Sequence, residues 1–338
     1  MIDFEQLSPD SPAIILLCSS VGTERAAGPR PLGPRTWAKL SERLARQSLR
    51  GPRDLLGLTA DDIDRSLDVG GDEAARYARL LARGGQLAFE LDRLRSRGIW
   101  VVTIADEAYP ARLVERLGRD APPVLFGSGP AGLLTGGGVA IVGSREADDE
   151  AVAFTAHLAA AAAAGGSAVV SGGARGIDAT AMRAAYEAGG SVVGVLPEGV
   201  EHRLREASSR SAVAGGQAVL VSPYHPGAAF SAGAAMGRNK IIYALSDVAV
   251  VVSSADGSGG TWTGAVEAIE GAWVPVLVRD GPGVPDGNRA LKTRGAAPIR
   301  RADIVGTVTS SALRQFAVPH EGRVAEPTLQ YDQQRLFE

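Results

Sequence analysis

The chain has 338 residues, of which 45% are hydrophobic and 22% charged, and its formal net charge is −3. This length suits one large α/β domain with a smaller one, and the composition excludes disorder throughout. The only cysteine, Cys18, excludes an intramolecular disulfide and a multi-thiolate metal site, so we expect a cytoplasmic protein. Because the net charge is mildly negative, a polyanionic partner would need a local basic site.

The first part of the chain, up to about residue 97, has a helical pattern. The run Ala13–Cys18 is apolar but too short to cross a bilayer, so we expect a buried helix there. Two further sets of apolar residues each mark one helical face, and the second predicts a single longer helix. These sets are Trp37, Leu40 and Leu44, and then Leu80, Leu81, Leu87, Leu91 and Leu94.

From residue 98 onward, short β-type runs alternate with helical patterns. A lead-in of strand, helix and strand is followed by a series of expected strands at 139–143, 168–171, 191–196, 218–221, 247–252 and 274–278. The alternation predicts a doubly wound, mainly parallel α/β sheet, preceded by the small helical domain. The expected domains are residues 1–97 and 98–301, with a partly ordered tail at 302–338.

Two of these strands end in a glycine turn that carries an arginine. The strand Val139–Gly143 leads to Ser144 and Arg145, and Ser171 begins a turn that carries Arg175. Such turns present backbone N–H groups and a helix N-terminus to a phosphate, and the arginine adds a bidentate donor. Because open α/β sheets bind ligands at the carboxyl ends of their strands, we expect both arginines at one sheet edge and a phosphate-rich ligand.

Several motifs, in order from about Gly98 to Ile299, resemble the DNA-processing protein A (DprA, or Smf) family of single-stranded-DNA-binding recombination mediators. The motifs are Val139–Arg145, Ser171–Asp178, Glu187–Gly190, Gly237–Ile242, Ser258-Gly259 with Thr263, and Gly287-Asn288 with Leu291 and Gly295-Ala296. The resemblance implies an extended Rossmann-like domain after a small SAM/HhH-like helical one. Many members end in a winged helix, for which residues 302–338 are too few.

The residues and the resemblance together indicate a groove for phosphates. We expect its cations to converge at one mouth with backbone amides, and expect glycines to allow close approach of the ligand. Asp178 is assigned a supporting role, capping the helix that starts near Ala179 or orienting Arg175, and Asn288 is also a supporting residue. The candidate binding residues are Gly143, Ser144, Arg145, Ser171, Gly172, Gly173, Arg175, Gly176, Arg238, Asn239, Lys240, Ser258, Gly259 and Thr263.

By resemblance, the protein is a non-enzymatic binder that protects incoming or exposed single-stranded DNA and loads a RecA-type recombinase, in natural transformation or recombination. The resemblance also implies a homodimer, and we expect no membrane partner, cofactor or metal. The alternative is a nucleotide-binding sensor or a phosphoribohydrolase-like enzyme of the same glycine-rich superfamily. The glutamate nearest to the hydrolase motif, Glu267, is one position too far from Thr263, which disfavours catalysis and leaves nucleotide sensing open.

A few other charged and aromatic residues near these motifs were weighed for a role in binding. Arg203, Arg205 and Arg210 are interpreted as a solvated helix face. Glu198 follows a strand, where an acid works against a phosphate ligand. Trp262 either stacks on a base or packs between helix and sheet, and the pattern favours neither.

Overall fold

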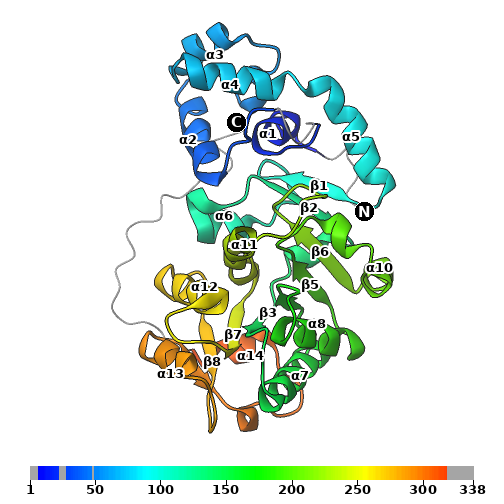
Figure 1. Cartoon of the computed structure of the whole chain (residues 1–338), viewed down its shortest axis with the longest axis vertical. Helices are drawn as coiled ribbons and strands as arrows, with labels where there is room; N and C mark the ends of the chain where they lie inside the picture. Colours follow the sequence, from blue (N-terminus) through cyan, green and yellow to red (C-terminus); the bar gives the residue numbers. More distant parts are fainter. Residues whose placement is uncertain (1–6, 23–27, 48, 318–338) are drawn as a thin grey trace. The chain divides into compact units, whose positions relative to one another are not determined.

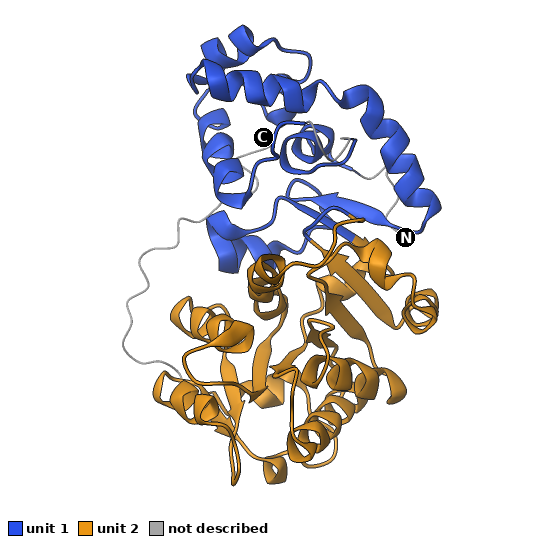
Figure 2. Ribbon diagram, viewed as in Figure 1, with its two compact units in different colours: residues 1–126, 223–225, 329–338 blue, residues 127–222, 226–328 orange. Residues whose placement is uncertain are grey.

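A computed structural model describes residues 7–22, 28–47 and 49–317. The described chain falls into two compact units (Figure 2). The first takes the residues up to Phe126 together with 223–225, and the second takes the remainder. The expected tail beyond residue 317 lies outside the described residues. None of the described helices is both long and apolar enough to cross a membrane.

The first unit is mainly helical, and its α1 (Ser11–Cys18) is buried, which confirms the expected buried helix. The single longer helix expected over the leucines from 80 to 94 is wrong. Gly84 and Gly85 begin a separate helix there, and the Arg83 side chain between the two helices donates to the Leu80 and Val21 carbonyls at 2.9 and 3.0 Å. The other helices are α2 (Pro34–Leu44), η2 (Pro52–Leu55), α3 (Ala60–Leu67), α4 (Gly71–Leu81), α5 (Gly84–Ser96), α6 (Ala111–Leu117) and η3 (Gly118–Asp120).

Two strands, β1 (Trp100–Thr103) and β2 (Val124–Ser128), lie before α6 and after η3, respectively. β1 belongs to the first unit, although we expected a domain boundary just before it. A buried carboxylate accounts for this grouping. Asp106 accepts hydrogen bonds from the Ser11 hydroxyl at 2.6 Å and the Thr103 hydroxyl at 3.0 Å, so it ties the end of β1 to the start of α1.

The second unit contains a parallel sheet with the strand order β6-β5-β4-β3-β7-β8-β9. Val139 of β3 pairs with Val169 on one side and Val248 on the other. The expected doubly wound fold is confirmed, and β9 was not expected. The strands are β3 (Val139–Gly143), β4 (Val169–Ser171), β5 (Val192–Val195), β6 (Ala218–Ser222), β7 (Val248–Ser253), β8 (Val276–Arg279) and β9 (Ala297–Ile299).

Helices cover both faces of this sheet. The chain runs from β3 to β6 in one direction and then returns to β7 on the other side of β3, so right-handed crossovers put α7 and α8 on one face and α11 to α13 on the other (Figure 1). The order of the strands therefore reverses between β3 and β7. The helices are η4 (Ala131–Leu134), α7 (Asp149–Ala164), α8 (Ile177–Glu187), α9 (Val200–Arg203), α10 (Ala207–Ala214), α11 (Ala232–Leu245), α12 (Gly259–Glu270), α13 (Asp286–Thr293), η5 (Arg301–Asp303) and α14 (Ser310–Arg314).

The last described helix, α14, lies at the amino-terminal edge of the sheet. The Ser310 hydroxyl donates to Asp247, just before β7, at 2.9 Å, and the Ser310 amide donates to the Ser167 hydroxyl, just before β4, at 2.9 Å. The described part of the expected tail thus packs on the second unit. The carboxyl-terminal edge, opposite to it, holds the sequence-predicted site.

Candidate functional site

A pocket of about 500 Å³ lies where the strand order reverses, at the carboxyl ends of β3 and β7. Helix α11 forms one wall, and the N-terminus of α12 forms another. This is the position at which open α/β sheets bind ligands, and we name it the switch-point pocket. Its lining includes Gly143, Ser144, Arg145, Asp178, Phe230, Met236, Arg238, Asn239, Tyr243, Ser258 and Gly259.

A second pocket of about 380 Å³ adjoins the first, and we name it the arginine pocket. The two share Arg145, Ala174, Phe230 and Arg238 in their linings, and we call the two adjoining pockets together the groove. The arginine pocket alone is lined by Gly173, Arg175, Pro197, Glu198, His202 and Arg203.

Two oppositely charged side chains, Arg238 and Asp178, are buried at the turn after β4. A Cβ atom placed on Gly172 would come within 1.8 Å of Arg238 Nη1 and 2.6 Å of Asp178 Oδ2, so a larger residue there must displace at least one of these side chains. The two side chains are 3% and 6% exposed, although they come from different helices, α11 and α8. The guanidinium beside Asp178 is therefore that of Arg238. The expectation that Asp178 orients Arg175 is wrong, because Arg175 is exposed at the rim of the arginine pocket.

Burial controls the ionisation of Asp178. Desolvation raises its pKa to about 6, and this rise is opposed by the Arg238 charge and by backbone N–H groups of Ala174, Gly143 and Gly172. The carboxylate thus accepts from both glycine turns instead of capping its own helix, which begins after Gly176. Asp178 supports the site by holding the two turns and one cation together.

The two glycine turns lie against each other. The Ile177 amide donates to the Ser144 carbonyl at 3.2 Å. Gly176 has a φ of +77°, and a Cβ atom there would come within 2.5 Å of the same carbonyl oxygen. On the outer side, the Arg145 guanidinium lies 5.6 Å above the centre of the Phe230 ring.

Helix α12 begins at the pocket wall and is anchored by Asn239. The Asn239 side chain donates from Nδ2 to the Gly260 carbonyl at 2.9 Å. Ser258 occupies the N-cap position without a side-chain capping bond, and Gly259 has a φ of +85°. The backbone N–H groups of the first turn therefore belong to an uncapped helix end that lines the pocket.

Other predicted binding residues lie elsewhere. Lys240 and Thr263 are half-buried and belong to the lining of neither pocket. Ser171 is completely buried, and its hydroxyl donates to the Ile141 carbonyl at 2.7 Å, so it joins strands β4 and β3. The expected convergence of cations is therefore observed for Arg145, Arg175 and Arg238, but not for Lys240.

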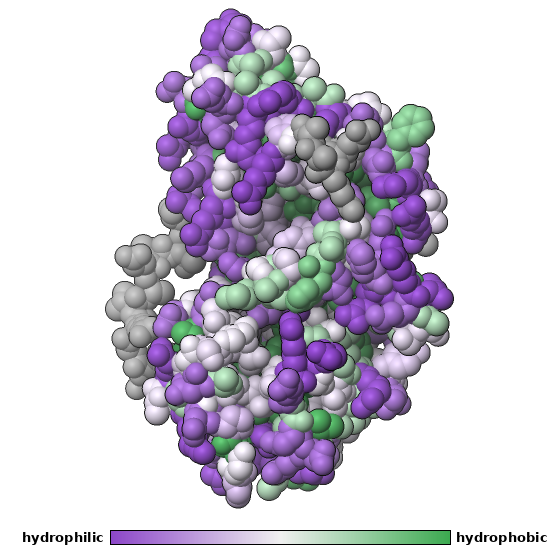
Figure 3. Space-filling view, viewed as in Figure 1, coloured by the Kyte–Doolittle hydropathy of each residue, from purple (hydrophilic) through white to green (hydrophobic). Residues whose placement is uncertain are grey.

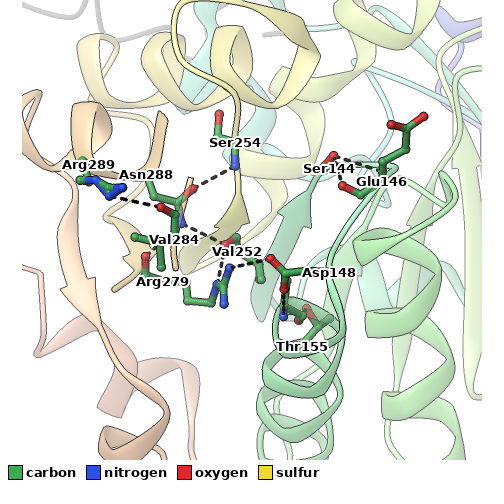
Figure 4. A network of polar contacts seen from close by, with 11 residues as sticks. Ser144, Glu146, Asp148, Thr155, Val252, Ser254, Arg279, Val284, Asn288 and Arg289 are labelled. Carbon is green, nitrogen blue, oxygen red and sulfur yellow. Dashed lines mark hydrogen bonds and ion pairs between the residues drawn. The ribbon is translucent and has the colours of Figure 1, made fainter. Parts of the chain in front are cut away.

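Asn288 supports the site from behind (Figure 4). Its Oδ1 accepts from the Ser254 amide at 2.9 Å, and its Nδ2 donates to the Val252 and Arg279 carbonyls at 3.0 Å each. The buried Arg279 donates from Nε to the Val252 carbonyl at 3.0 Å, and its Nη2 lies 3.9 Å from Asp148. This network fixes the carboxyl ends of β7 and β8 beside the loop that carries Ser144.

Sequence reasoning missed several groove residues. Arg203 was interpreted as part of a solvated face, but it lines the arginine pocket, donates to the Gly173 carbonyl at 3.0 Å and lies 3.2 Å from Glu198. Phe230 and Met236 are 53% and 51% exposed and line the groove, and Figure 3 shows hydrophobic surface near α11. The only signal for Phe230 was an aromatic residue in a glycine- and alanine-rich loop. Trp262 is 9% exposed, which favours the packed interpretation.

A doubly wound sheet with glycine turns and arginines at its switch point defines a Rossmann-like protein with a basic carboxyl-terminal edge. Residues 100–306 match the family model of DNA recombination-mediator protein A, and the chain therefore belongs to that family. The match runs from β1 to residue 306 of the second unit and does not include α14, and it agrees with the resemblance seen in the motifs.

Similar proteins described as DNA processing protein DprA are found in several bacteria. The chain is 31% identical over 263 residues to a putative DNA processing protein DprA of Mycobacterium tuberculosis (strain H37Rv), covering 69% of this chain and 63% of the relative. It is 32% identical over 178 residues to DprA of Bacillus subtilis, covering 52% and 59%. The chain thus spans less than two thirds of either relative.

The fold also matches a solved structure. The X-ray structure of DNA processing protein A from Streptococcus pneumoniae aligns with a TM-score of 0.57 at 22% identity, covering 81% of this chain and 97% of that chain. At this identity the likeness shows the fold alone.

Proposed function

We propose that the protein binds single-stranded DNA in the groove formed by the two pockets. The observation that carries this proposal is the convergence of Arg145, Arg175 and Arg203 on the groove, with Arg238 buried in the lining that the two pockets share, although they come from separate segments of a chain with a net charge of −3. Guanidinium groups along a groove neutralise successive phosphates and release counterions. The matched family supports DNA as the polyanion.

The groove also offers a stacking surface. Phe230 is exposed between the two pockets, and Arg145 covers one part of its ring. Every base has a π-face, so an exposed aromatic side chain in a basic groove favours unpaired bases over a duplex, whose bases are stacked on one another. This argues for single-stranded DNA instead of duplex DNA as the ligand.

In this proposal the bound strand is protected and passed to a RecA-type recombinase, with the protein acting as a homodimer in the cytoplasm and without chemistry of its own. The description of the matched family, DNA recombination-mediator protein A, supports a role in recombination. Nucleotide processing would need an acid in the groove. The alternative's candidate acid, Glu267, is exposed and lies outside the lining of both pockets.

The test is fluorescence anisotropy with a labelled single-stranded oligonucleotide over a salt series. The affinity should fall as salt rises, and Arg175→Ala should reduce the slope by about 0.7, the value for one phosphate contact with a single strand. Arg314→Ala is the matched control, because Arg314 is exposed on α14 at the opposite edge of the sheet. Absence of binding at low salt, or identical slopes for Arg175→Ala and the native chain, would refute the proposed groove.

A further inference from the structure

A carboxylate lies in the arginine pocket, although the binding of phosphates favours cations alone. Glu198 follows β5 and lines this pocket together with Arg175 and Arg203. Its Oε1 atom accepts from Arg203 Nη2 at 3.2 Å, and the same nitrogen donates to the Gly173 carbonyl at 3.0 Å. Because one guanidinium bonds to both the acid and the turn after β4, the Glu198 side chain is held in a fixed position in the lining.

The second oxygen of this carboxylate is available to a ligand. Oε2 of Glu198 accepts no hydrogen bond from the residues that the structure describes, and it is accessible to solvent. The side chain as a whole is 13% exposed, so the group is anchored on one side and open on the other. A carboxylate only accepts hydrogen bonds and repels phosphates. The part of a DNA strand that it can contact is therefore a base.

Phe230 supplies a stacking surface in the same lining. Its ring is 53% exposed, and the Arg145 guanidinium covers one side of it at 5.6 Å from the ring centre. An unpaired base that stacks on an aromatic ring leaves its Watson–Crick edge free for hydrogen bonds with neighbouring side chains. The pocket of about 380 Å³ thus presents both an aromatic face and a carboxylate oxygen.

The four bases differ in what their Watson–Crick edges offer to a carboxylate. Guanine presents two adjacent donors, N1–H and N2–H, and a carboxylate can accept both, because each of its oxygens has more than one lone pair. Cytosine and adenine present an amino group beside a ring nitrogen that is an acceptor. Thymine presents one N–H between two carbonyl oxygens. Since an acceptor that faces the carboxylate is unfavourable, guanine is the base that fits.

We propose that the arginine pocket selects guanine, with the Glu198 carboxylate accepting from N1–H and N2–H of a base that stacks on Phe230. Arg145 and Arg175, in the same lining, bind the adjoining phosphates. Contacts to phosphates carry no sequence information, whereas contacts to base edges do. This inference rests on the proposed strand binding and adds a base preference to it.

The test is a competition experiment in which unlabelled strands displace a labelled thymine oligonucleotide, followed by fluorescence anisotropy at low salt. The competitors are an all-thymine strand and strands in which every third base is guanine, cytosine or adenine. The guanine strand should bind about tenfold more tightly than the all-thymine strand, in the lower part of the range for a bidentate base contact. Replacing guanine by hypoxanthine, which keeps N1–H but lacks the N2 amino group, should remove most of this gain.

Glu198→Gln should abolish the preference. Glutamine keeps one acceptor oxygen and places an amide donor against the donors of guanine, so the guanine and thymine strands should bind with equal affinity. The lost negative charge favours every strand, so the ratio of the two affinities measures the base contact. Glu206→Gln is the control and should keep the tenfold ratio, because Glu206 lies 3.4 Å from Arg203 but outside the pocket.

The outcomes distinguish failure of base selection from failure of strand binding. Equal affinity of the native chain for all the competitors, or a guanine preference that persists in Glu198→Gln, would overturn the selection of guanine and leave strand binding intact. A preference for cytosine or adenine over guanine would overturn it as well. Absence of binding to every strand at low salt would instead refute the groove, and base selection with it.

Discussion

The charged side chains of the two pockets differ in their exposure to solvent. In the arginine pocket, Arg175 is exposed, and Arg203 is half-buried and balanced by Glu198 at 3.2 Å. In the switch-point pocket, Arg238 and Asp178 are nearly inaccessible to water, and Tyr243 is buried beside them. Exposed charges attract a polyanion through counterion release, whereas buried groups act through shape and hydrogen bonding. One sheet edge thus combines exposed cations, whose affinity for a polyanion depends on salt, with a pocket lined by buried groups.

The largest effect should follow from filling the space over the buried pair. Gly172→Ala places a methyl group 1.8 Å from Arg238 Nη1, which must displace the guanidinium from Asp178. Removing one partner of a buried charge pair costs about 3–5 kcal/mol, which is the upper limit for the fall in the free energy of unfolding that urea denaturation should measure here. Gly233→Ala is the control, because no atom lies within 4 Å of its added Cβ and alanine is the better helix former. An equally stable Gly172→Ala variant would contradict the close packing.

The pH dependence of stability tests the burial of Asp178. Its pKa of about 6, against an ordinary 3.8, means that the folded state retains a proton that the unfolded state releases. The contribution of this group to the free energy of unfolding is therefore fully present below about pH 4, decreases by about 3 kcal/mol as the pH rises from there through 6, and is constant above that. In Asp178→Asn this loss should be absent, so the variant should gain stability relative to the native chain between pH 4 and 7.

Urea denaturation at several pH values measures this difference. Asp256→Asn, which changes an exposed carboxyl group outside both pockets, is the control and should follow the native profile. Parallel profiles for the native chain and Asp178→Asn would show that Asp178 is not desolvated as described.

A smaller effect is expected where the two halves of the groove meet. Phe230→Ala removes the exposed ring from both linings and should weaken single-strand binding by about 1–3 kcal/mol, the contribution of one stacked base. Stability should be unchanged, because the ring is 53% exposed. Phe89→Ala removes another exposed ring, on α5, and should leave anisotropy titrations unaffected. Equal affinities for the two variants would place the bases elsewhere.

The smallest effect concerns the acid in the arginine pocket. Glu198→Gln removes the carboxylate that neutralises Arg203, so DNA affinity should rise a few-fold, less than about 1 kcal/mol, and the salt dependence should become steeper. Glu206→Gln is the control, because Glu206 also lies near Arg203, at 3.4 Å, but outside the pocket. A decrease in affinity for Glu198→Gln alone would mean that Glu198 holds Arg203 in its binding position.

Much of the second unit was predictable because its strands are marked by local patterns. The predicted strand at 139–143 agrees with β3, and the other predicted strands agree within about two residues at each end. Strand β9 was missed because it has only three residues, Ala297–Ile299, one of them a proline. In the first unit, the leucine spacing continued across Gly84 and concealed the break between α4 and α5.

The candidate site was predictable only in part. Arg145 and Arg175 follow strand ends, so their edge of the sheet could be inferred from topology. Lys240 lies two positions after Arg238 on α11, and two helical residues differ by about 200° in direction. Arg238 is therefore buried against the sheet, whereas Lys240 points in another direction and lies outside the lining of both pockets.

The sequence alone determined the alternation of strands and helices and the glycine turns at the strand ends, because hydrophobic periodicity and φ preferences act over a few residues. The tertiary structure decided which cation neutralises Asp178 and left the Tyr243 hydroxyl without a partner among the described residues. Such pairings depend on how α11 packs against α8 and the sheet. They involve groups that are some 60 positions apart in the chain, and no local pattern specifies them.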